Sequence, residues 1–308
     1  MIPIGYFRDR THGRRIPTGR PLANLTASVL HMAAADAIRQ LRTRGHVNLQ
    51  QWLPSFVQAA TPIVTVFVRE GQRQRAKELL AAIESRRRKS KSLVRKAFEP
   101  WVSRTTFDNL SFGFDVFNPQ VIEYIRTATY HFVESTLATA ATDAEKAYAQ
   151  VKQALGAKLQ SGEGTQAINR AIYQIFRDPA KASRVGQTEA ARAMAGGGYM
   201  LAHDVGVTTV RWLASSDACD ICRDLNGQER ELGTPFMINP KAKGPYKIIL
   251  HSPAHPHCFC TETYIIDNAA NVNEGMVAKL RLAAYDPGVV APRFNRGLRL
   301  AASLRERL

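Results

Sequence analysis

The stretches "CDICRDLNG" at residues 219–227 and "HPHCFC" at residues 255–260 contain all four cysteines of this 308-residue chain. In the first stretch, Cys219 and Cys222 are spaced so that a turn can point both thiols at one place. The two cysteines of the second stretch lie on one face of an extended segment, because side chains alternate along a strand. Two close pairs of this kind are a common source of tetrahedral zinc ligands. The cysteines therefore predict a small metal-stabilised module.

More candidate ligands are present than a tetrahedral site needs. The five candidates are Cys219, Cys222, His255, Cys258 and Cys260. Cys219, Cys222 and Cys258 are expected members, and either His255 or Cys260 completes the set. His255 is slightly favoured because it precedes Cys258 by three residues and forms a second close pair with it. His257 points away from Cys258 in an extended chain and is not expected to be a ligand.

Other roles for the cysteines fit the sequence less well. Disulfides are disfavoured in a cytosolic chain, and a redox Cys-x-x-Cys motif expects a βαβ context that is missing here. Buried thiols without a metal would not cluster so tightly. A catalytic zinc would need an open position and a general acid or base, whereas Asp217, Asp220 and Asp224 are more simply explained as solvated turn residues. A structural Zn²⁺ is the resulting hypothesis.

The sequence before the cysteine module has a helical pattern. Apolar residues recur every three or four positions from Asn24, and Gly45 is a suitable stop. Residues 48–88 predict one or two helices, broken near Pro54 and Pro62 because proline removes a helical hydrogen bond. Two further short helices are expected over residues 161–178 and 179–206.

The clearest helix begins at Asn118, a natural cap, with Pro119 in the first helical position. It carries an apolar stripe that we expect to be core: Val121, Ile122, Ile125, Ala128, Thr129, Phe132, Val133 and Thr136. Such a stripe is far more often core packing than a binding site.

After Val207 the sequence becomes rich in β-branched residues, and Asn226-Gly227 is a strong hairpin signal. Short strands are predicted within residues 208–215, 228–233, 246–252 and 261–267. The predicted fold class is α+β, with a mainly α-helical N-terminal region followed by a small zinc-stabilised β-containing C-terminal module. The predicted segments are a basic extended arm (1–21), a helical domain (22–180), the zinc module (181–267) and a basic tail (268–308).

Charge indicates the kind of partner. The formal net charge is +16, with a pI near 10.0, which favours a polyanion. The densest basic run lacks acids and aromatics, and its basic residues are Arg86, Arg87, Arg88, Lys89, Lys91, Arg95 and Lys96. These residues predict contact with double-stranded DNA through phosphates, without reading of the sequence. No apolar run has the roughly 18–20 residues of a membrane span and the N-terminus lacks a signal-peptide core, so a cytosolic location is expected.

One string of residues resembles the minor head protein, or head-morphogenesis, family of tailed bacteriophages (Mu F-like). It runs from a Thr-Glu on a helix through a tryptophan strand to Cys-x-x-Cys and His-Pro-x-Cys-x-Cys. Its members here are Thr188, Glu189, Arg192, Gly206, Trp212, Cys219, Cys222, Gly227, His255, Pro256, Cys258 and Cys260. The resemblance covers about residues 118–266. Two features depart from the family pattern: Phe259 stands where the family usually has arginine, and the segment 228–254 is long.

The resemblance implies a virion component without a shared catalytic activity. Family members associate with the portal protein, contact packaged DNA and act in head assembly and DNA ejection. It also implies a location in the head interior near the portal vertex, and in the host cytoplasm during assembly. A scaffold or major capsid protein is a further candidate partner. Glu189 and Arg192, three residues apart, are expected to form a structural pair on one helix; contact with the portal is the alternative.

Two other classes of protein compete with this interpretation. A zinc-dependent nucleic-acid hydrolase is the main alternative, because His251, His255 and His257 are clustered. No acidic motif accompanies them at a recognisable spacing. A zinc-ribbon DNA-binding regulator lacks a base-reading helix beside the cysteine pairs.

Overall fold

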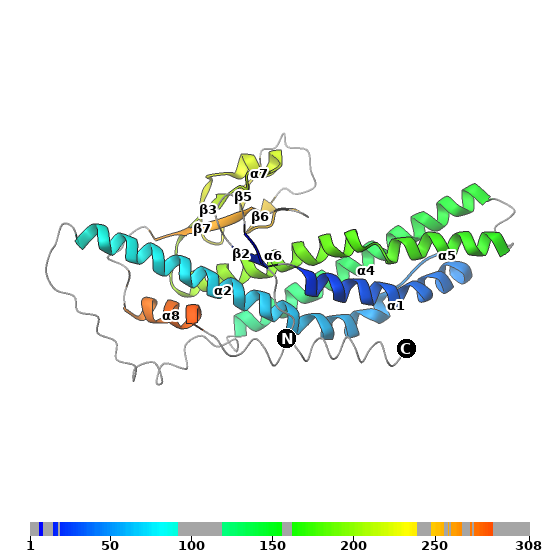
Figure 1. The fold of residues 1–308 in the computed structure, drawn as a ribbon, viewed down its shortest axis with the longest axis horizontal. Helices are drawn as coiled ribbons and strands as arrows, with labels where there is room; N and C mark the ends of the chain where they lie inside the picture. Colours follow the sequence, from blue (N-terminus) through cyan, green and yellow to red (C-terminus); the bar gives the residue numbers. More distant parts are fainter. Residues whose placement is uncertain are drawn as a thin grey trace. The chain divides into compact units, whose positions relative to one another are not determined.

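The computed structural model describes residues 6–8, 15–17, 19–91, 119–155, 162–238, 248–255, 258, 260–266, 272 and 274–285. These residues are mostly helical, with a small three-stranded antiparallel sheet in the C-terminal region (Figure 1). The predicted α+β fold class is confirmed. By its internal contacts the chain divides into two units, each built from segments that are distant in sequence. The four consecutive segments predicted above stay predictions.

The first unit draws its described residues from Met1–Thr65 and Arg126–Ala190. It contains strands β1 (Tyr6–Arg8) and β2 (Arg15–Pro17), helix α1 (Arg20–Arg44), the short 3₁₀ helix η1 (Gln50–Trp52) and helix α5 (Gly162–Phe176). It also contains parts of three long helices: α2 (Leu53–Lys91), α4 (Pro119–Leu155) and α6 (Pro179–Asp204). Strands β1 and β2 pair antiparallel, within the segment predicted to be an extended arm.

The second unit draws on Val66–Ile125 and Ala191–Val290, and holds the remaining parts of α2, α4 and α6. Its other elements are β3 (Thr209–Leu213), α7 (Asp220–Leu225), β4 (Glu229–Glu231), β5 (Phe236–Met237), β6 (Ile248–Ile249), β7 (Thr261–Ile265) and α8 (Glu274–Tyr285). Strand β3 is central in the order β4-β3-β7, and β5 pairs with β6 separately. Val210 of β3 pairs with Arg230 on one side and Tyr264 on the other.

The ends of α1 and α4 follow the predicted signals closely. Helix α1 ends at Gly45, which adopts the left-handed conformation (φ 76°) and donates its N–H to the carbonyl of Leu41. It begins at Arg20, before the predicted start, with Pro21 in the first turn. Helix α4 begins at Pro119 as predicted. The expected cap before it lies outside the described residues.

The predicted break at Pro62 is wrong, because α2 continues through this residue. Proline inside a helix costs roughly 3 kcal/mol, since one N–H is lost and the ring clashes with the preceding turn. Phe56, Ile63 and Phe67 are fully buried on both sides of Pro62. Burying three such side chains stabilises the helix by more than that cost. Tertiary packing therefore overrides the local signal.

The stripe predicted on α4 is buried at most of its positions. Val121, Ile125, Thr129 and Phe132 are all at most 5% exposed, whereas Ile122 is 46% exposed. Ile122 lies off the face that the other residues share, since buried positions recur every three or four residues. The prediction that Ile122 is core is wrong.

The core of the second unit joins the sheet to helices from distant parts of the chain. Trp212 of β3 is fully buried and its ring meets Phe236 edge to face at 5.2 Å. The same cluster includes Leu79 of α2, Leu201 of α6 and Leu280 of α8. The sheet therefore does not have a core of its own: its apolar face is completed by three helices.

Glycines let α2 and α6 approach closely in this unit. A Cβ at Gly71 would overlap the carbonyl oxygen of Met194, and a Cβ at Gly197 would overlap that of Val68. Both positions are helical, so the glycines are needed for space and not for an unusual backbone conformation. Among the described residues, no helix is both long enough and apolar enough to cross a membrane.

Candidate metal centre

The first cysteine pair lies at the start of helix α7. Cys219 is the residue before the helix, in extended conformation, and Cys222 lies in the first turn. The sequence predicted a turn here, and the structure has a short helix. Cys222 is fully buried and Cys219 is exposed, so the pair reaches from the core of the second unit to its surface.

The Asn226-Gly227 turn joins α7 to β4, so the predicted hairpin between two strands is wrong. Gly227 has a positive φ of 80°, which only glycine adopts without strain. The N–H of Gly227 donates to the carbonyl of Trp212 (2.9 Å), and the Asn226 side chain accepts from the N–H of Ala214 (2.9 Å). These bonds tie the end of the cysteine helix to the end of β3.

The second group of candidate ligands lies between β6 and β7. The N–H of Cys258 donates to the carbonyl of His255 (3.1 Å), which closes a turn between the two residues. Cys258 and Cys260 are buried, and β7 begins directly after Cys260. Pro256, His257 and Phe259 lie outside the described residues.

All five predicted ligands come together around Cys222. The Nε2 atom of His255 lies 3.1 Å from the sulfur of Cys219 and 3.3 Å from that of Cys222. The sulfurs of Cys222 and Cys258 are 3.7 Å apart. The ligand atoms of Cys219, Cys222 and His255 form one group within 4.8 Å, and those of Cys222, Cys258 and Cys260 form another. These groups could hold a metal ion.

The distances between these atoms are compatible with binding to one metal ion. All four cysteines are free thiols. Two sulfurs on one tetrahedral zinc ion, each about 2.3 Å from the metal, are roughly 3.8 Å apart; the Cys222–Cys258 separation of 3.7 Å agrees. A single nitrogen of His255 faces two sulfurs. Because one ring nitrogen either donates one proton or accepts through one lone pair, one ordinary hydrogen bond explains only one of these contacts.

The three buried thiols shift one another's pKa values. Hydrogen bonds to Cys258 and Cys260, together with burial, raise the pKa of Cys222. Hydrogen bonds from Cys222 and Cys258 lower the pKa of Cys260 to about 2. The contact with Cys222 lowers the pKa of Cys258, but the contact with Cys260 and burial outweigh it and raise that pKa to about 11. Thiolates this close together repel one another, so a bound cation would be needed to stabilise more than one of them.

The buried side chain of Glu262 connects the residues before the second cysteine stretch with the strand that follows it. Glu262 of β7 is 1% exposed and accepts from the backbone N–H of Ser252 and from the hydroxyl of Tyr264 (3.1 Å). Burial raises the pKa of Glu262, against the opposing effects of His251 and Arg75. No sequence signal pointed to this residue, because an isolated glutamate in a short strand is ordinarily exposed.

Helix α2 supports the same strand through Arg75. The guanidinium of Arg75 donates to the carbonyl oxygen of Glu262 (2.8 Å) and to the side chain of Glu78 (2.6 Å). The same guanidinium lies 4.2 Å from the centre of the Tyr264 ring. Arg75 is buried. A helix that precedes the cysteine stretches by more than a hundred residues therefore holds the strand that follows Cys260.

The other predicted site residues are dispersed. Asp217, Asp220 and Asp224 are exposed, as expected for turn residues. The ring of His251 faces the carbonyl of Ser252 (2.9 Å) and belongs to neither group of candidate metal ligands.

The basic run and the predicted structural pair lie on two helices. Arg86 is exposed near the end of α2, which continues to Lys91, while Arg95 and Lys96 lie outside the described residues. Glu189 and Arg192 are half-buried on α6, and their pairing stays a prediction.

Comparison of the chain with models of protein families, with curated proteins and with solved structures finds no match in any of the three. The site is therefore interpreted from its own chemistry, together with the motif resemblance described above.

Proposed function

We propose that this chain is a minor head protein of the tailed-bacteriophage Mu F-like family and that its cysteine cluster binds one structural Zn²⁺. The observation that carries the proposal is the convergence of the motif's ligands: Cys219, His255, Cys258 and Cys260 lie around Cys222. The order and spacing of the wider motif supply the link to the family.

Zinc is the metal that suits these ligands best. Thiolates and imidazole nitrogen are the preferred ligands of Zn²⁺, and structural sites use four of them. Three cysteines and His255 form the favoured set, since its nitrogen faces two of the sulfurs. The alternative set replaces His255 with Cys260, which belongs to the group around Cys222 and Cys258.

Metal analysis of the full chain tests both parts of this assignment. Protein purified under reducing conditions should contain about one zinc ion per chain. With His255 as the fourth ligand, His255→Ala should lower zinc affinity far more than Cys260→Ser; the reverse order would assign the place to Cys260. Folded, reduced protein without zinc, and without affinity for added zinc, would contradict the metal proposal.

The proposed DNA contact rests on charge. The chain carries a net charge of +16, and Arg86 is exposed where the basic run begins. Binding to duplex DNA should lack sequence preference and weaken steeply with salt. Changing Arg86, Arg87, Arg88 and Lys89 to alanine should flatten the salt dependence, whereas a control with alanine at Lys146 and Lys152, both exposed on α4, should change it less. An unchanged slope of DNA affinity against salt in the first variant would show that this basic run does not contact DNA.

The proposed portal contact is assigned mainly to the helical residues 22–180, whose basic side chains would steer docking onto acidic groups. Helices α2, α4 and α6 each run through both structural units, so cutting the chain at residue 180 would damage both. The test therefore uses the full chain: crosslinking to the portal protein encoded with it, followed by mass spectrometry. Crosslinks concentrated in residues 181–267 would make the cysteine module the docking site.

We assign no enzymatic activity. The favoured set of three cysteines and His255 would fill the four positions of one zinc ion, which leaves no place for the water molecule that a catalytic zinc requires. Incubation with plasmid DNA and Mg²⁺ or Zn²⁺ should leave the plasmid intact. Nicking that disappears in His251→Ala would favour the nucleic-acid hydrolase instead.

A further inference from the structure

A second candidate site lies in the first unit, between helices α1 and α5. The guanidinium of Arg177, directly after α5, donates to the ring nitrogen of His31 (3.0 Å), and Arg42 lies 3.5 Å from the hydroxyl of Thr165. These two contacts show that α1 and α5 run antiparallel. Tyr173 consequently lies at the level of Ala35, between the two contacts.

A cavity of about 600 Å³ opens along this pair of helices, and its lining residues are His31, Met32, Ala35, Asp36, Arg39, Trp52 and Tyr173. Its volume is in the range of small-molecule sites. Trp52 and Tyr173 bring two aromatic rings to one cavity, and Met32 and Ala35 add an apolar surface. Such a lining suits a flat aromatic ligand.

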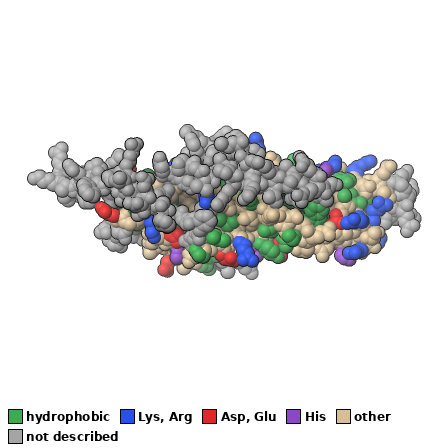
Figure 2. Space-filling view, turned by 90° about the horizontal axis from the view of Figure 1, so that it is seen from below, with side chains coloured by type: hydrophobic (Ala, Val, Ile, Leu, Met, Phe, Trp, Pro, Cys, Tyr) green, Lys and Arg blue, Asp and Glu red, His purple; other side chains and the backbone are tan. Residues whose placement is uncertain are grey.

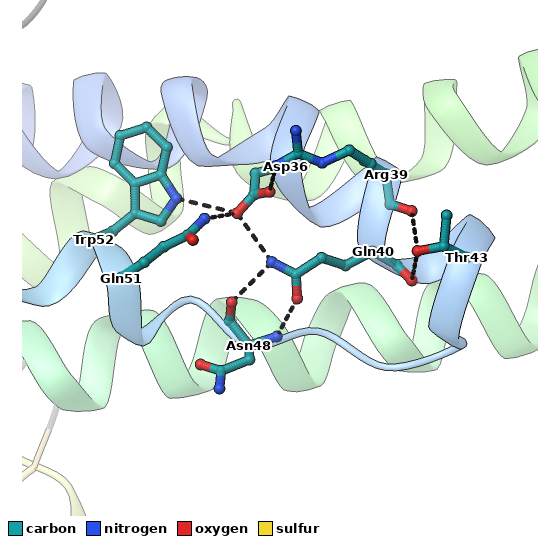
Figure 3. A network of polar contacts seen from close by, with 7 residues as sticks. All are labelled: Asp36, Arg39, Gln40, Thr43, Asn48, Gln51 and Trp52. Carbon is teal, nitrogen blue, oxygen red and sulfur yellow. Dashed lines mark hydrogen bonds and ion pairs between the residues drawn. The ribbon is translucent and has the colours of Figure 1, made fainter.

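The acidic group in the cavity already has partners within the protein. Asp36 is 7% exposed and accepts from Arg39, from Gln40 (2.9 Å), from Gln51 and from the indole N–H of Trp52 (3.5 Å) (Figure 3). Its negative charge is therefore balanced by Arg39 and by neutral donors. These bonds also fix the indole ring of Trp52 at the cavity wall.

Two arginines lie at the cavity: Arg39 lines it, and Arg177 contacts the lining residue Tyr173. Arg39 and Arg42 are exposed on α1, Arg170 is exposed on α5, and Arg177 is exposed directly after α5. Figure 2 shows Lys and Arg side chains, in blue, on the face that it draws. The guanidinium of Arg177 lies 4.7 Å from the centre of the Tyr173 ring. The nearby Asp178 accepts from the N–H groups at the start of α6.

We propose that this cavity binds one unpaired nucleotide of a nucleic-acid strand, with its base against Trp52 and Tyr173 and its phosphate beside Arg39 and Arg177. Aromatic rings stack on bases of any sequence, and arginines neutralise phosphates. The bases inside a duplex have no free face to stack, so the ligand is a single strand or a frayed end. The proposal deepens the DNA contact proposed above and places a second, different contact on the helical unit.

The test compares variants of Tyr173 in the full chain. The probe is a fluorescein-labelled 12-residue oligodeoxythymidine, and binding is measured by fluorescence anisotropy. Tyr173→Ala should weaken binding about tenfold, the effect expected from loss of one stacked base, while Tyr173→Phe should stay within about twofold. The matched control is Tyr148→Ala, a half-buried tyrosine on α4 that does not line the cavity.

A second variant separates phosphate binding from stacking. Arg177→Gln should reduce the slope of binding against salt by about 0.7 for each phosphate that the protein no longer neutralises. A purely structural role for Arg177 would change affinity without this change in slope. Circular dichroism verifies that each variant is folded.

Parallel titrations with a blunt DNA duplex distinguish this inference from the proposed function. Loss of oligothymidine binding in Tyr173→Ala with unchanged duplex binding supports the cavity. Wild-type oligothymidine binding that does not respond to Tyr173→Ala overturns the cavity and leaves the proposed function standing. Absence of binding to either DNA by the wild type overturns both the cavity and the proposed DNA contact, and a cavity that takes only an acidic aromatic peptide would then be a protein-docking site.

Discussion

Asp36 in the first unit and Cys222 in the second are both buried polar groups, but they are satisfied in different ways. Asp36 receives donors from Arg39, Gln40, Gln51 and Trp52, which all lie within sixteen residues of it. Cys222 is surrounded by other sulfurs and by a histidine nitrogen. The first centre is complete within the protein, whereas the second gathers electron-rich atoms that could hold a metal ion.

This difference shows that two buried polar groups can be stabilised in different ways. A carboxylate that accepts several hydrogen bonds is stabilised by the fold itself. A group of thiols and an imidazole is stabilised mainly when a metal replaces their protons. The first unit should therefore be insensitive to metal, and the second should depend on it.

Removal of the metal, or Cys222→Ser, should have the largest effect. Structural zinc in small metal-binding peptides contributes about 10–16 kcal/mol at neutral pH, which is as large as the stability of a whole domain. The sheet shares its core with α2, α6 and α8, so these helices should loosen as well. Limited proteolysis and near-UV circular dichroism should report the loss.

The matched control is Asp224→Ala, an exposed residue of the same short helix that supplies no candidate ligand. It should behave like the wild type in the presence and absence of a chelator. Resistance of Cys222→Ser to proteolysis at the wild-type level would show that the cluster folds without a metal.

Asp36→Ala should have the next largest effect, about 3 kcal/mol in the free energy of unfolding. The change leaves the half-buried donors of Gln40 and Trp52 without this acceptor, and unmet donors cost about 1–3 kcal/mol each. Arg39 is 73% exposed and regains water, so it adds little. Urea titration should show the loss, and chelator should not change it.

Asp36→Asn is the companion variant, because its amide oxygen still accepts from neutral donors. Asp36→Asn should lower the free energy of unfolding less than Asp36→Ala does. Equal losses in the two variants would mean that the charge of Asp36, and not its hydrogen bonds, holds the network.

Glu262→Gln should have the smallest effect and should depend on pH. Burial raises the pKa of Glu262, so the fold disfavours the ionised form, and its contribution to stability falls as pH rises above the value in the unfolded chain. The neutral amide avoids this penalty. The stability of Glu262→Gln relative to the wild type should therefore increase from acid to neutral pH, in urea titrations at several pH values.

Glu262→Ala should be less stable than Glu262→Gln at every pH, since it leaves the N–H of Ser252 and the hydroxyl of Tyr264 without their acceptor. A relative stability of Glu262→Gln that falls with rising pH would contradict a raised pKa. Together, Glu262→Gln and Glu262→Ala separate the contribution of the hydrogen bonds of Glu262 from that of its charge, as the two variants of Asp36 do for that residue.

Local sequence signals predicted the parts of the fold that local chemistry determines. Gly45 ends α1 because left-handed backbone favours glycine, and Pro119 begins α4 because its first N–H has no helical partner. The five candidate ligands were predicted because all the cysteines occur in two short stretches. These stretches do meet in space.

The remaining features depend on contacts between distant residues. Pro62 stays helical because buried neighbours outweigh the missing hydrogen bond. Arg75 supports β7 and Glu262 fastens the ligand loop, and neither position stands out in the sequence. The cavity beside Trp52 and Tyr173 forms only when α1 and α5 come together, which no single segment reveals.

Helices α2, α4 and α6 each contribute to both units, and this sets an order of events on the ribosome. Among the residues that the structure describes, those of the first unit extend to Ala190 and those of the second to Tyr285. Contacts between residues so far apart in sequence form late. The apolar faces of these helices therefore stay exposed until most of the chain has been synthesised. During this interval the nascent protein is most exposed to aggregation and to chaperones.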